Sequence, residues 1–227
     1  NSIINSTNTT ISNTGKLTIN GGTYTGSNYS YYSNSSKDVN ISSATFNGVF
    51  YNSGNNTVCM EDSTINGNLQ NNTSDLTLTR STVTTGRITN NGTLTMNDST
   101  FTATPTGYDY YYYQDVAMAN SGIANLNHSN ILINKEAAGK SSIAISNTGE
   151  LNVENNSKVY IGIDNASYTY KGISTTSNGL TTITNSEVKA TGGSTNYAIY
   201  TEGANAKTIL LTGNAISELA STGYGSY

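Results

Sequence analysis

One short hydrophobic pattern recurs along the 227-residue chain and constrains its fold more than any other feature. In nine places an apolar residue is followed by a second one, five positions later in eight copies and six positions later in one. The pairs are Ile19/Tyr24, Ile41/Phe46, Met60/Ile65, Leu78/Val83, Met96/Phe101, Leu126/Ile131, Val153/Val159, Ile183/Val188 and Leu211/Ile216. Apolar residues at alternate positions usually lead into the first member, as in Leu17-Thr18-Ile19. This period of two indicates β-strands.

A turn motif precedes the hydrophobic pair in several repeats. Asn-x-Gly occurs at residues 13–15, 52–54, 90–92, 120–122 and 147–149. Asn and Gly tolerate positive φ, so the motif predicts a turn with that backbone conformation. We therefore expect three short strands in each repeat, separated by turns, and almost no helix, because no stripe with a helical period is present.

Stacked repeats would place equivalent residues in columns about 4.8 Å apart. Asn13, Asn90, Asn120 and Asn147 should then form an amide ladder at one corner, in which each side chain bonds to the next. A hydroxyl column is expected from Ser63, Ser81, Ser99, Ser129, Ser157 and Ser186, which lie three positions after the first apolar member, or four in the case of Ser157, whose repeat has one extra residue. Asn and Ser are unusually frequent in this chain, and these two structural columns account for many of them without a functional role.

The combined pattern Asn-x-Gly-x-Leu-x-Ile-x4-Phe/Val/Tyr resembles the right-handed parallel β-helix of the pectin-lyase-like superfamily. The resemblance implies an all-β, single-stranded β-solenoid of about nine three-strand coils with loop insertions. The coils would cover residues 11–218 of one domain, 1–227, within a longer surface protein. Members of this superfamily include polysaccharide lyases and hydrolases, phage tailspikes and surface adhesins, so the fold alone implies no activity. The Asn/Thr-rich, weakly charged coils are most similar to bacterial surface adhesins and autotransporter passengers.

Charge and composition exclude several classes of function. The chain has 10 Lys+Arg against 14 Asp+Glu, and no basic patch that would support nucleic-acid binding. A single cysteine excludes a disulfide framework and a Cys-based zinc site. No apolar run is long enough to enter a membrane directly.

One column of chemically active residues lies two positions after the first apolar member. It contains Asp62, Arg80, Asp98 and His128, with Glu61 beside Asp62. An acid, a base and a cation in one column is what hydrolysis of a polysaccharide needs. The alternative is an exposed ladder of ion pairs, in which Arg80 would lower the pKa of its acidic neighbours. In that case the column has no catalytic role.

Tyrosines are the most informative candidates for ligand binding. Tyr110, Tyr111, Tyr112 and Tyr113 lie in an insertion between strands, and Tyr29, Tyr31 and Tyr32 lie in the first long turn. Their rings combine an apolar face with a hydroxyl group, a combination favoured in recognition surfaces. The alternative is that some rings fold back and cover the flank of the strands.

Two further possibilities have weak support. No cofactor or metal is predicted, although Asp109 and Asp115 could share a Ca²⁺ ion, since hard cations prefer several carboxylate oxygens. Thr77-Leu78-Thr79 is a Thr-x-Thr motif, but no flat, repeated array of the kind that ice binding requires is evident from the sequence.

We therefore predict a non-catalytic, extracellular segment of a bacterial surface adhesin, either cell-bound or secreted. It would display loops on a rigid scaffold and bind a host-surface glycan or protein. One alternative is a polysaccharide lyase or glycoside hydrolase acting on pectin-like polymers. Another is a structural spacer or self-associating module.

Overall fold

The computed structural model describes the backbone of residues 2–103, 108–109, 114–133 and 141–219. Strands make up 74% of the structure, and no helix is present in these ranges. The strands are β1 (Ile3–Ser6), β2 (Ser12–Asn13), β3 (Leu17–Ser33), β4 (Val39–Asn52), β5 (Thr57–Glu61), β6 (Thr64–Asn71), β7 (Asp75–Thr79), β8 (Thr82–Asn90), β9 (Thr93–Asn97), β10 (Thr100–Ala103), β11 (Tyr108–Asp109), β12 (Gln114–Asn120), β13 (Ile123–Asn127), β14 (Asn130–Ile133), β15 (Ser141–Asn147), β16 (Glu150–Glu154), β17 (Lys158–Thr176), β18 (Leu180–Ile183), β19 (Glu187–Glu202), β20 (Lys207–Leu210) and β21 (Ala215–Leu219).

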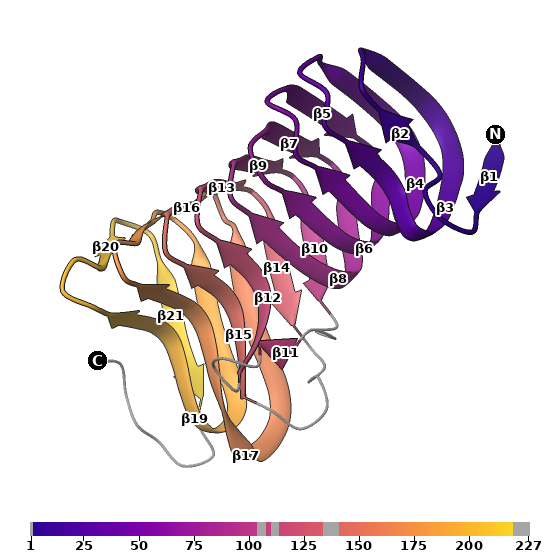
Figure 1. Cartoon of the computed structure of the whole chain (residues 1–227). Coiled ribbons are helices and arrows are strands. Elements are labelled where there is room, and N and C mark those ends of the chain that lie inside the picture. The colour runs from indigo at the N-terminus through magenta and orange to yellow at the C-terminus, as the bar shows by residue number, and fades with distance from the viewer. Residues whose placement is uncertain (1, 104–107, 110–113, 134–140, 220–227) are drawn as a thin grey trace.

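The strands pair with equivalent strands of the neighbouring repeat. The ladders are parallel, apart from the short antiparallel pair β11–β12. Strands of successive repeats therefore lie side by side along one long axis, with the N-terminal strands at one end and the C-terminal strands at the other (Figure 1). We call one passage of the chain around this axis a layer.

The predicted fold class is wrong in its arrangement, although its all-β content is confirmed. The strands do not form separate three-strand coils, because β3, β4, β17 and β19 each run without interruption around a bend. Strand β8 pairs with both β10 and β12, and β17 pairs with both β14 and β15, so each of these strands connects two ladders. The result is a closed eight-stranded parallel β-barrel core rather than the predicted right-handed β-helix, or solenoid. The pairing is irregular at these bends, where the register shifts between Thr25 and Tyr31 in β3 and between Gly162 and Thr169 in β17.

The hydrophobic pairs form two buried columns inside the core. The register joins Ile19 to Ile41, Met60 and the equivalent residues as far as Ile183, and joins Tyr24 to Phe46, Ile65 and their equivalents as far as Ile216. The last first-column position is an exception: Ile183 pairs with Leu210 and not with the predicted Leu211. Burial of these columns supplies the hydrophobic stabilisation that a single short strand cannot provide.

The corner between the two columns has one backbone conformation in every layer. The residue two positions after the first column has a φ between 46° and 77° in nine layers. These residues are Gly21, Ser43, Asp62, Arg80, Asp98, His128, Asn155, Asn185 and Gly213. The left-handed region favours Gly and Asn and tolerates Asp and His, and this accounts for most of the residue types at the corner.

Glycines serve two different purposes at the other bends. Gly67 has a φ of 152°, and a Cβ atom there would lie 2.4 Å from the carbonyl oxygen of Gly48. Gly122, from an Asn-x-Gly motif, does not have positive φ, so the predicted reason for this glycine is wrong. It is required because a Cβ atom would lie 2.0 Å from the carbonyl oxygen of Gly92 in the preceding layer. The turns are present, but close packing between layers selects this glycine.

Both predicted polar columns are present in the core. Along the amide ladder, Asn71 donates to Asn90 at 2.9 Å, Asn90 to Asn120 at 2.7 Å, and Asn120 to Asn147 at 2.8 Å. Asn13 lies at the same corner, where it donates to Ser33 at 3.4 Å. Five of the six serine hydroxyls, all except that of Ser186, accept a hydrogen bond from a backbone amide of the preceding layer, as Ser99 does from Ser81 at 3.0 Å. Asn71 also belongs to the ladder but was not predicted. The residue two positions after it is Thr73 and not the glycine of the Asn-x-Gly motif.

Candidate functional site

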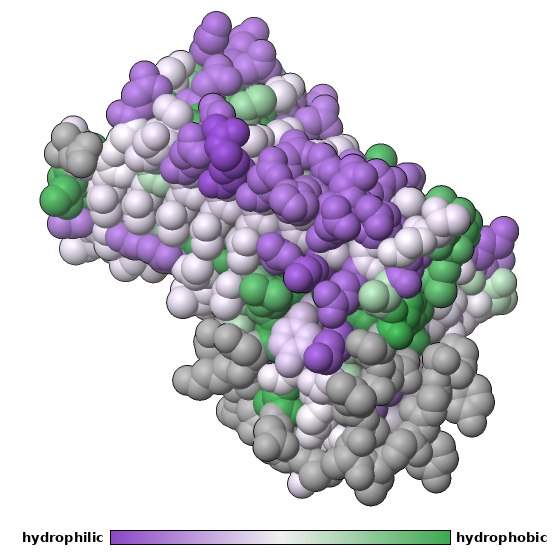
Figure 2. Space-filling view, turned by 180° about the vertical axis from the view of Figure 1, so that it is seen from behind, coloured by the Kyte–Doolittle hydropathy of each residue, from purple (hydrophilic) through white to green (hydrophobic). Residues whose placement is uncertain are grey.

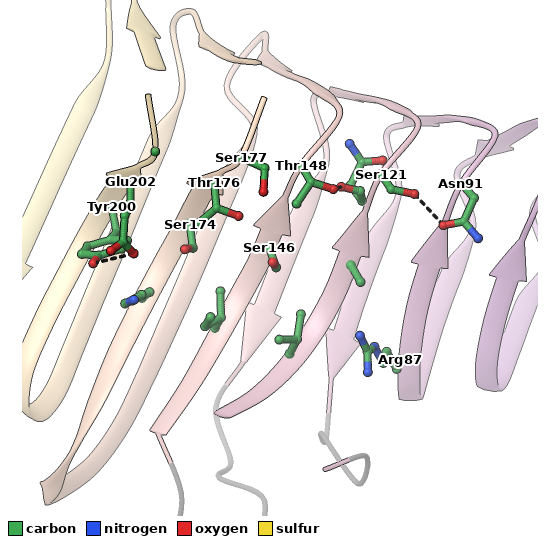
Figure 3. A pocket seen from close by; sticks show the side chains of 16 residues that line it. Arg87, Asn91, Ser121, Ser146, Thr148, Ser174, Thr176, Ser177, Tyr200 and Glu202 are labelled. Atoms are coloured by element: carbon green, nitrogen blue, oxygen red, sulfur yellow. Dashed lines mark hydrogen bonds between the residues drawn. The ribbon is translucent and has the colours of Figure 1, made fainter. Parts of the chain in front are cut away.

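A groove of about 540 Å³ lies on the side of the molecule formed by β8, β12, β15, β17 and β19 (Figure 3). We call it the polar groove. The residues that line the groove lie just before and just after the corner that the amide ladder occupies. The parallel register aligns them in rows. One row, just before the corner, contains Ala119, Ser146, Ser174 and Tyr200. A second row, just after it, contains Asn91, Ser121, Thr148, Thr176 and Glu202.

Short hydroxyl and amide side chains line most of the groove. Ser121 donates to the amide oxygen of Asn91 at 2.6 Å, and Thr148 donates to the backbone carbonyl of Asn120 at 3.4 Å. Val116 and Ile143 add apolar surface to the lining. A groove with both hydroxyl and apolar lining suits a ligand that carries hydroxyl groups on a partly apolar ring.

A lysine, a tyrosine and a glutamate come together at one end of the groove. The Lys171 ammonium lies 3.5 Å from the centroid of the Tyr200 ring, and the Tyr200 hydroxyl donates to Glu202 at 3.0 Å. Burial lowers the pKa of Lys171 from the usual lysine value, and the opposing effect of the Glu202 charge is smaller. The hydrogen bond to Glu202 is the main cause of the raised pKa of Tyr200, with burial second. The tyrosine thus remains protonated and donates to the carboxylate.

Arg87 provides a second cation at the other end (Figure 3). Its Nε atom is buried and has no hydrogen-bond partner among the described residues. Arg87 lies on β8 and Lys171 on β17, three strand spacings apart through β12 and β15, or about 14 Å. Glu202 is the one acidic side chain that the described lining contributes. The groove therefore has an excess of positive charge in a chain whose net charge is −4.

The predicted Asp62–Arg80–Asp98–His128 column exists, but the structure divides it into two exposed pairs. Arg80 contacts Asp62 at 2.9 Å and also pairs with Glu61, while His128 Nδ1 lies 2.6 Å from Asp98. The hydrogen bond from Arg80 lowers the pKa of Asp62 and raises that of Arg80. These side chains are at least half exposed, and none of them lines the polar groove. A carboxyl with a lowered pKa is unsuited to act as a general acid.

The predicted tyrosine sites have different environments. Tyr31 is fully buried and stacks on Phe50, with ring centroids 4.3 Å apart, so it packs in the core. Tyr29 and Tyr32 are half-buried and cluster with Tyr51, whose ring is parallel to that of Tyr32 at a centroid distance of 5.2 Å. Tyr110, Tyr111, Tyr112 and Tyr113 lie outside the described residues.

The structure shows no support for a metal site in its described part. No group of three or more His, Cys, Asp or Glu side chains that could hold an ion occurs there. Asp115 is buried on β12, and the side chain of Asp109 lies outside the described residues. Within the same ranges, no helix has the length and apolar character needed to cross a membrane.

Sequence reasoning missed the residues of the polar groove. No feature of the sequence indicated one shared location for Tyr200, Arg87, Lys171 and Glu202. Tyr200 and Glu202 lie on either side of the corner that the amide ladder occupies, so an Asn between them would have indicated their positions. The corner residue is Thr175 in β17 and Thr201 in β19, so this Asn signal is missing from both strands. Lys171 lies four residues before this corner, beside Gly172, where the pairing of β17 with β19 skips one position between Lys171–Tyr197 and Ile173–Ile199.

Comparisons with protein-family models, curated proteins and solved structures gave no match to this chain.

Proposed function

We propose that the chain is a non-catalytic binding segment of a bacterial surface adhesin, and that the polar groove binds an acidic glycan. The observation that carries this proposal is the groove itself, with cations near both ends and hydroxyl groups between them. Sugar hydroxyls would bond to Ser146, Ser174 and Thr176, and a carboxylate or sulfate of the glycan would pair with Lys171 or Arg87. The Tyr200 ring is already covered by Lys171, so its role is to position that ammonium group.

Charge complementarity supports an acidic ligand over a neutral one. A cation that is partly removed from water gains more from pairing with an anion than an exposed cation does. Lys171 is half-buried, and the buried Nε of Arg87 is without a partner in the described structure. An acidic glycan in the groove would pair with the Lys171 ammonium and with the guanidinium group of Arg87. Arg80 already pairs with Glu61 and Asp62, and His128 already contacts Asp98, so these exposed groups offer less to an acidic ligand.

A glycan array that includes uronate-, sialate- and sulfate-bearing oligosaccharides tests the proposal. We expect binding to acidic glycans that falls at least tenfold in Lys171→Ala and in Arg87→Ala. Lys189→Ala is the matched control, because Lys189 also lies over a tyrosine ring, that of Tyr160 at 5.4 Å, but outside the groove. Equal losses in the control, or no glycan binding by the unmodified protein, would reject the proposal.

An enzymatic assay separates this function from the catalytic alternative. The protein is incubated with pectin-like and other acidic polymers, and reducing ends and unsaturated products are measured. We expect neither product above the background of heat-denatured protein. Turnover that is lost in Asp98→Asn would favour a hydrolase and overturn the non-catalytic assignment. Turnover lost in Lys171→Ala would instead favour a lyase that uses the groove.

A further inference from the structure

A second surface, separate from the polar groove, consists of two aligned rows of small polar side chains. We call it the threonine face. The first row contains Thr23, Thr45, Thr64, Thr82 and Thr100, and the second contains Thr25, Asn47, Asn66, Thr84 and Thr102. The core residues Tyr24, Phe46, Ile65, Val83 and Phe101 separate the rows along each strand, so both rows point away from the core.

The parallel register makes this face a regular two-dimensional array. Neighbouring residues of one row are about 4.8 Å apart, and the two rows are about 6.6 Å apart along the strand. Each row spans five layers without a register shift at these positions. Figure 2 shows this side of the molecule, with repeated rows of side chains of intermediate hydropathy over its N-terminal half. A regular repeated array that the sequence did not reveal is therefore present.

None of the ten residues carries a charge, which is unusual for the solvent-facing side of a sheet. Charged residues enter the same rows only in later layers, at Lys158, Glu187 and Lys189. The ten positions also contain no aromatic residue, so a sugar ring would find no face on which to stack. A regular, neutral solid that is recognised through hydroxyl and methyl groups fits this surface better than a charged polymer or a polysaccharide.

The hydrogen bonding of the two rows differs in a way that favours an external partner. In the second row, Asn47 donates to Thr25 at 3.0 Å, Asn66 donates to Asn47 at 2.8 Å, and Thr84 donates to Asn66 at 2.6 Å. These bonds hold the side chains in place. The first-row hydroxyls make no side-chain hydrogen bond within the described structure. They remain available to water.

The spacing of the array is close to that of hydrogen-bonded water. In a tetrahedral network with O···O bonds of about 2.75 Å, second-neighbour oxygens lie about 4.5 Å apart. The strand spacing of about 4.8 Å exceeds this by about 0.3 Å, or about 1.2 Å over the four intervals of a row. The misfit stays well below one repeat along the whole row. We infer that the threonine face binds ice, through water molecules ordered by the first-row hydroxyls.

Partitioning into growing polycrystalline ice tests this inference with the purified chain. We expect enrichment in the ice over an inert protein of similar size. The double variant Thr64→Lys/Thr82→Lys, in the middle of the first row, should lower the enrichment at least fivefold. Thr95→Lys is the matched control, because Thr95 is also a half-buried, outward threonine, on a different face whose rows contain Glu61 and Glu154.

Other outcomes of the same design would overturn the inference. These are no enrichment of the unmodified protein, an equal loss in Thr95→Lys, and unchanged enrichment in the double variant. If the lysine variant does not fold, as judged by circular dichroism, Thr64→Val/Thr82→Val replaces it, because valine keeps the shape and removes the hydroxyl. Retention on crystalline cellulose that exceeds retention on ice, and that the same changes abolish, would assign the face to a polysaccharide. Lys171→Ala should leave ice partitioning unchanged, which keeps this test separate from that of the groove.

Discussion

The ammonium nitrogen of Lys171 lies 3.5 Å from the centre of the Tyr200 ring, across the neighbouring strands β17 and β19. The tyrosine hydroxyl in turn donates to Glu202. Three residues that are up to 31 positions apart in sequence thus form one cluster at the end of the polar groove. A cation over an aromatic face gains about 0.5–2 kcal/mol, depending on its exposure, and this contact holds Lys171 in position.

The lowered pKa of Lys171 predicts how acidic-glycan binding depends on pH. Because burial favours the neutral amine, Lys171 loses its charge at a lower pH than an ordinary lysine. Binding should weaken as the pH rises through that lowered value. Lys171→Arg, whose guanidinium stays charged, should retain binding to higher pH. Titration of affinity between about pH 7 and 10 checks this, and identical pH profiles for the two proteins would contradict it.

Thr85 is a β-branched residue with a φ of 64°, a conformation that is unfavourable for its side chain. Thr85→Gly should therefore raise the free energy of unfolding by about 1 kcal/mol, since relief of the strain exceeds the added flexibility of the unfolded chain. The neighbouring Thr84→Gly is the control, because Thr84 is extended within β8 and glycine is unfavourable there. Chemical denaturation should move the two variants in opposite directions. A loss of stability in both would show that Thr85 is not strained.

Asn120 occupies the middle of the amide ladder. Its side chain donates to Asn147, to Gly122 and to the backbone carbonyl of Glu150 at 2.8 Å, and accepts from Asn90. Asn120→Ala leaves several of these buried groups without partners, so it should lower the free energy of unfolding by about 2–4 kcal/mol. Asn91→Ala, in the exposed row beside it, should cost about 1 kcal/mol or less. Similar losses in the two variants would contradict a structural role specific to the buried ladder.

The pair formed by Asp62 and Arg80 predicts a dependence of stability on acidic pH. Arg80 lowers the pKa of Asp62 in the folded protein below the ordinary value of 3.8. The unfolded chain therefore binds the proton first, and the stabilising contribution is present above that ordinary value and lost as the pH falls through the lowered one. Arg80→Gln should melt slightly below the unmodified protein at pH 6, and the two should converge in strong acid. A difference that persists unchanged at pH 2 would exclude the ion pair as its cause.

Tyr31 and Tyr32 are adjacent in sequence but differ in environment. Tyr31 is fully buried against Phe50, whereas Tyr32 is half exposed and stacks on Tyr51. Tyr31→Ala should lower the free energy of unfolding by about 3–5 kcal/mol, as expected for removal of a buried aromatic ring. Tyr32→Ala should cost clearly less. If Tyr31→Ala folded with unchanged stability and lost ligand binding, the original prediction of a binding role for Tyr31 would be restored.

The positions of residues that recur at a constant spacing from one repeat to the next were predictable, because each layer repeats the same local geometry. Met60 and Ile65 lie in the two core columns as expected, and Ser99 and Asn120 lie in their polar columns. The corner column was found from the sequence, but its cause was misread. Its residues share a left-handed backbone, whereas the prediction considered only their charges. Arg80 follows this backbone and not a catalytic requirement.

The sequence by itself determined that the chain is all-β, which residues face the core, and which side chains form columns, because alternation and spacing act within a few residues. Only the tertiary structure decided that the ladders close into a barrel core, that Tyr31 is buried beside the half-buried Tyr32, and that Arg87 and Lys171 share one groove. It alone aligned ten threonines and asparagines into a regular array. These features depend on how loops of different length return the chain to its register, and the contacts that fix that register join residues about 18–34 positions apart.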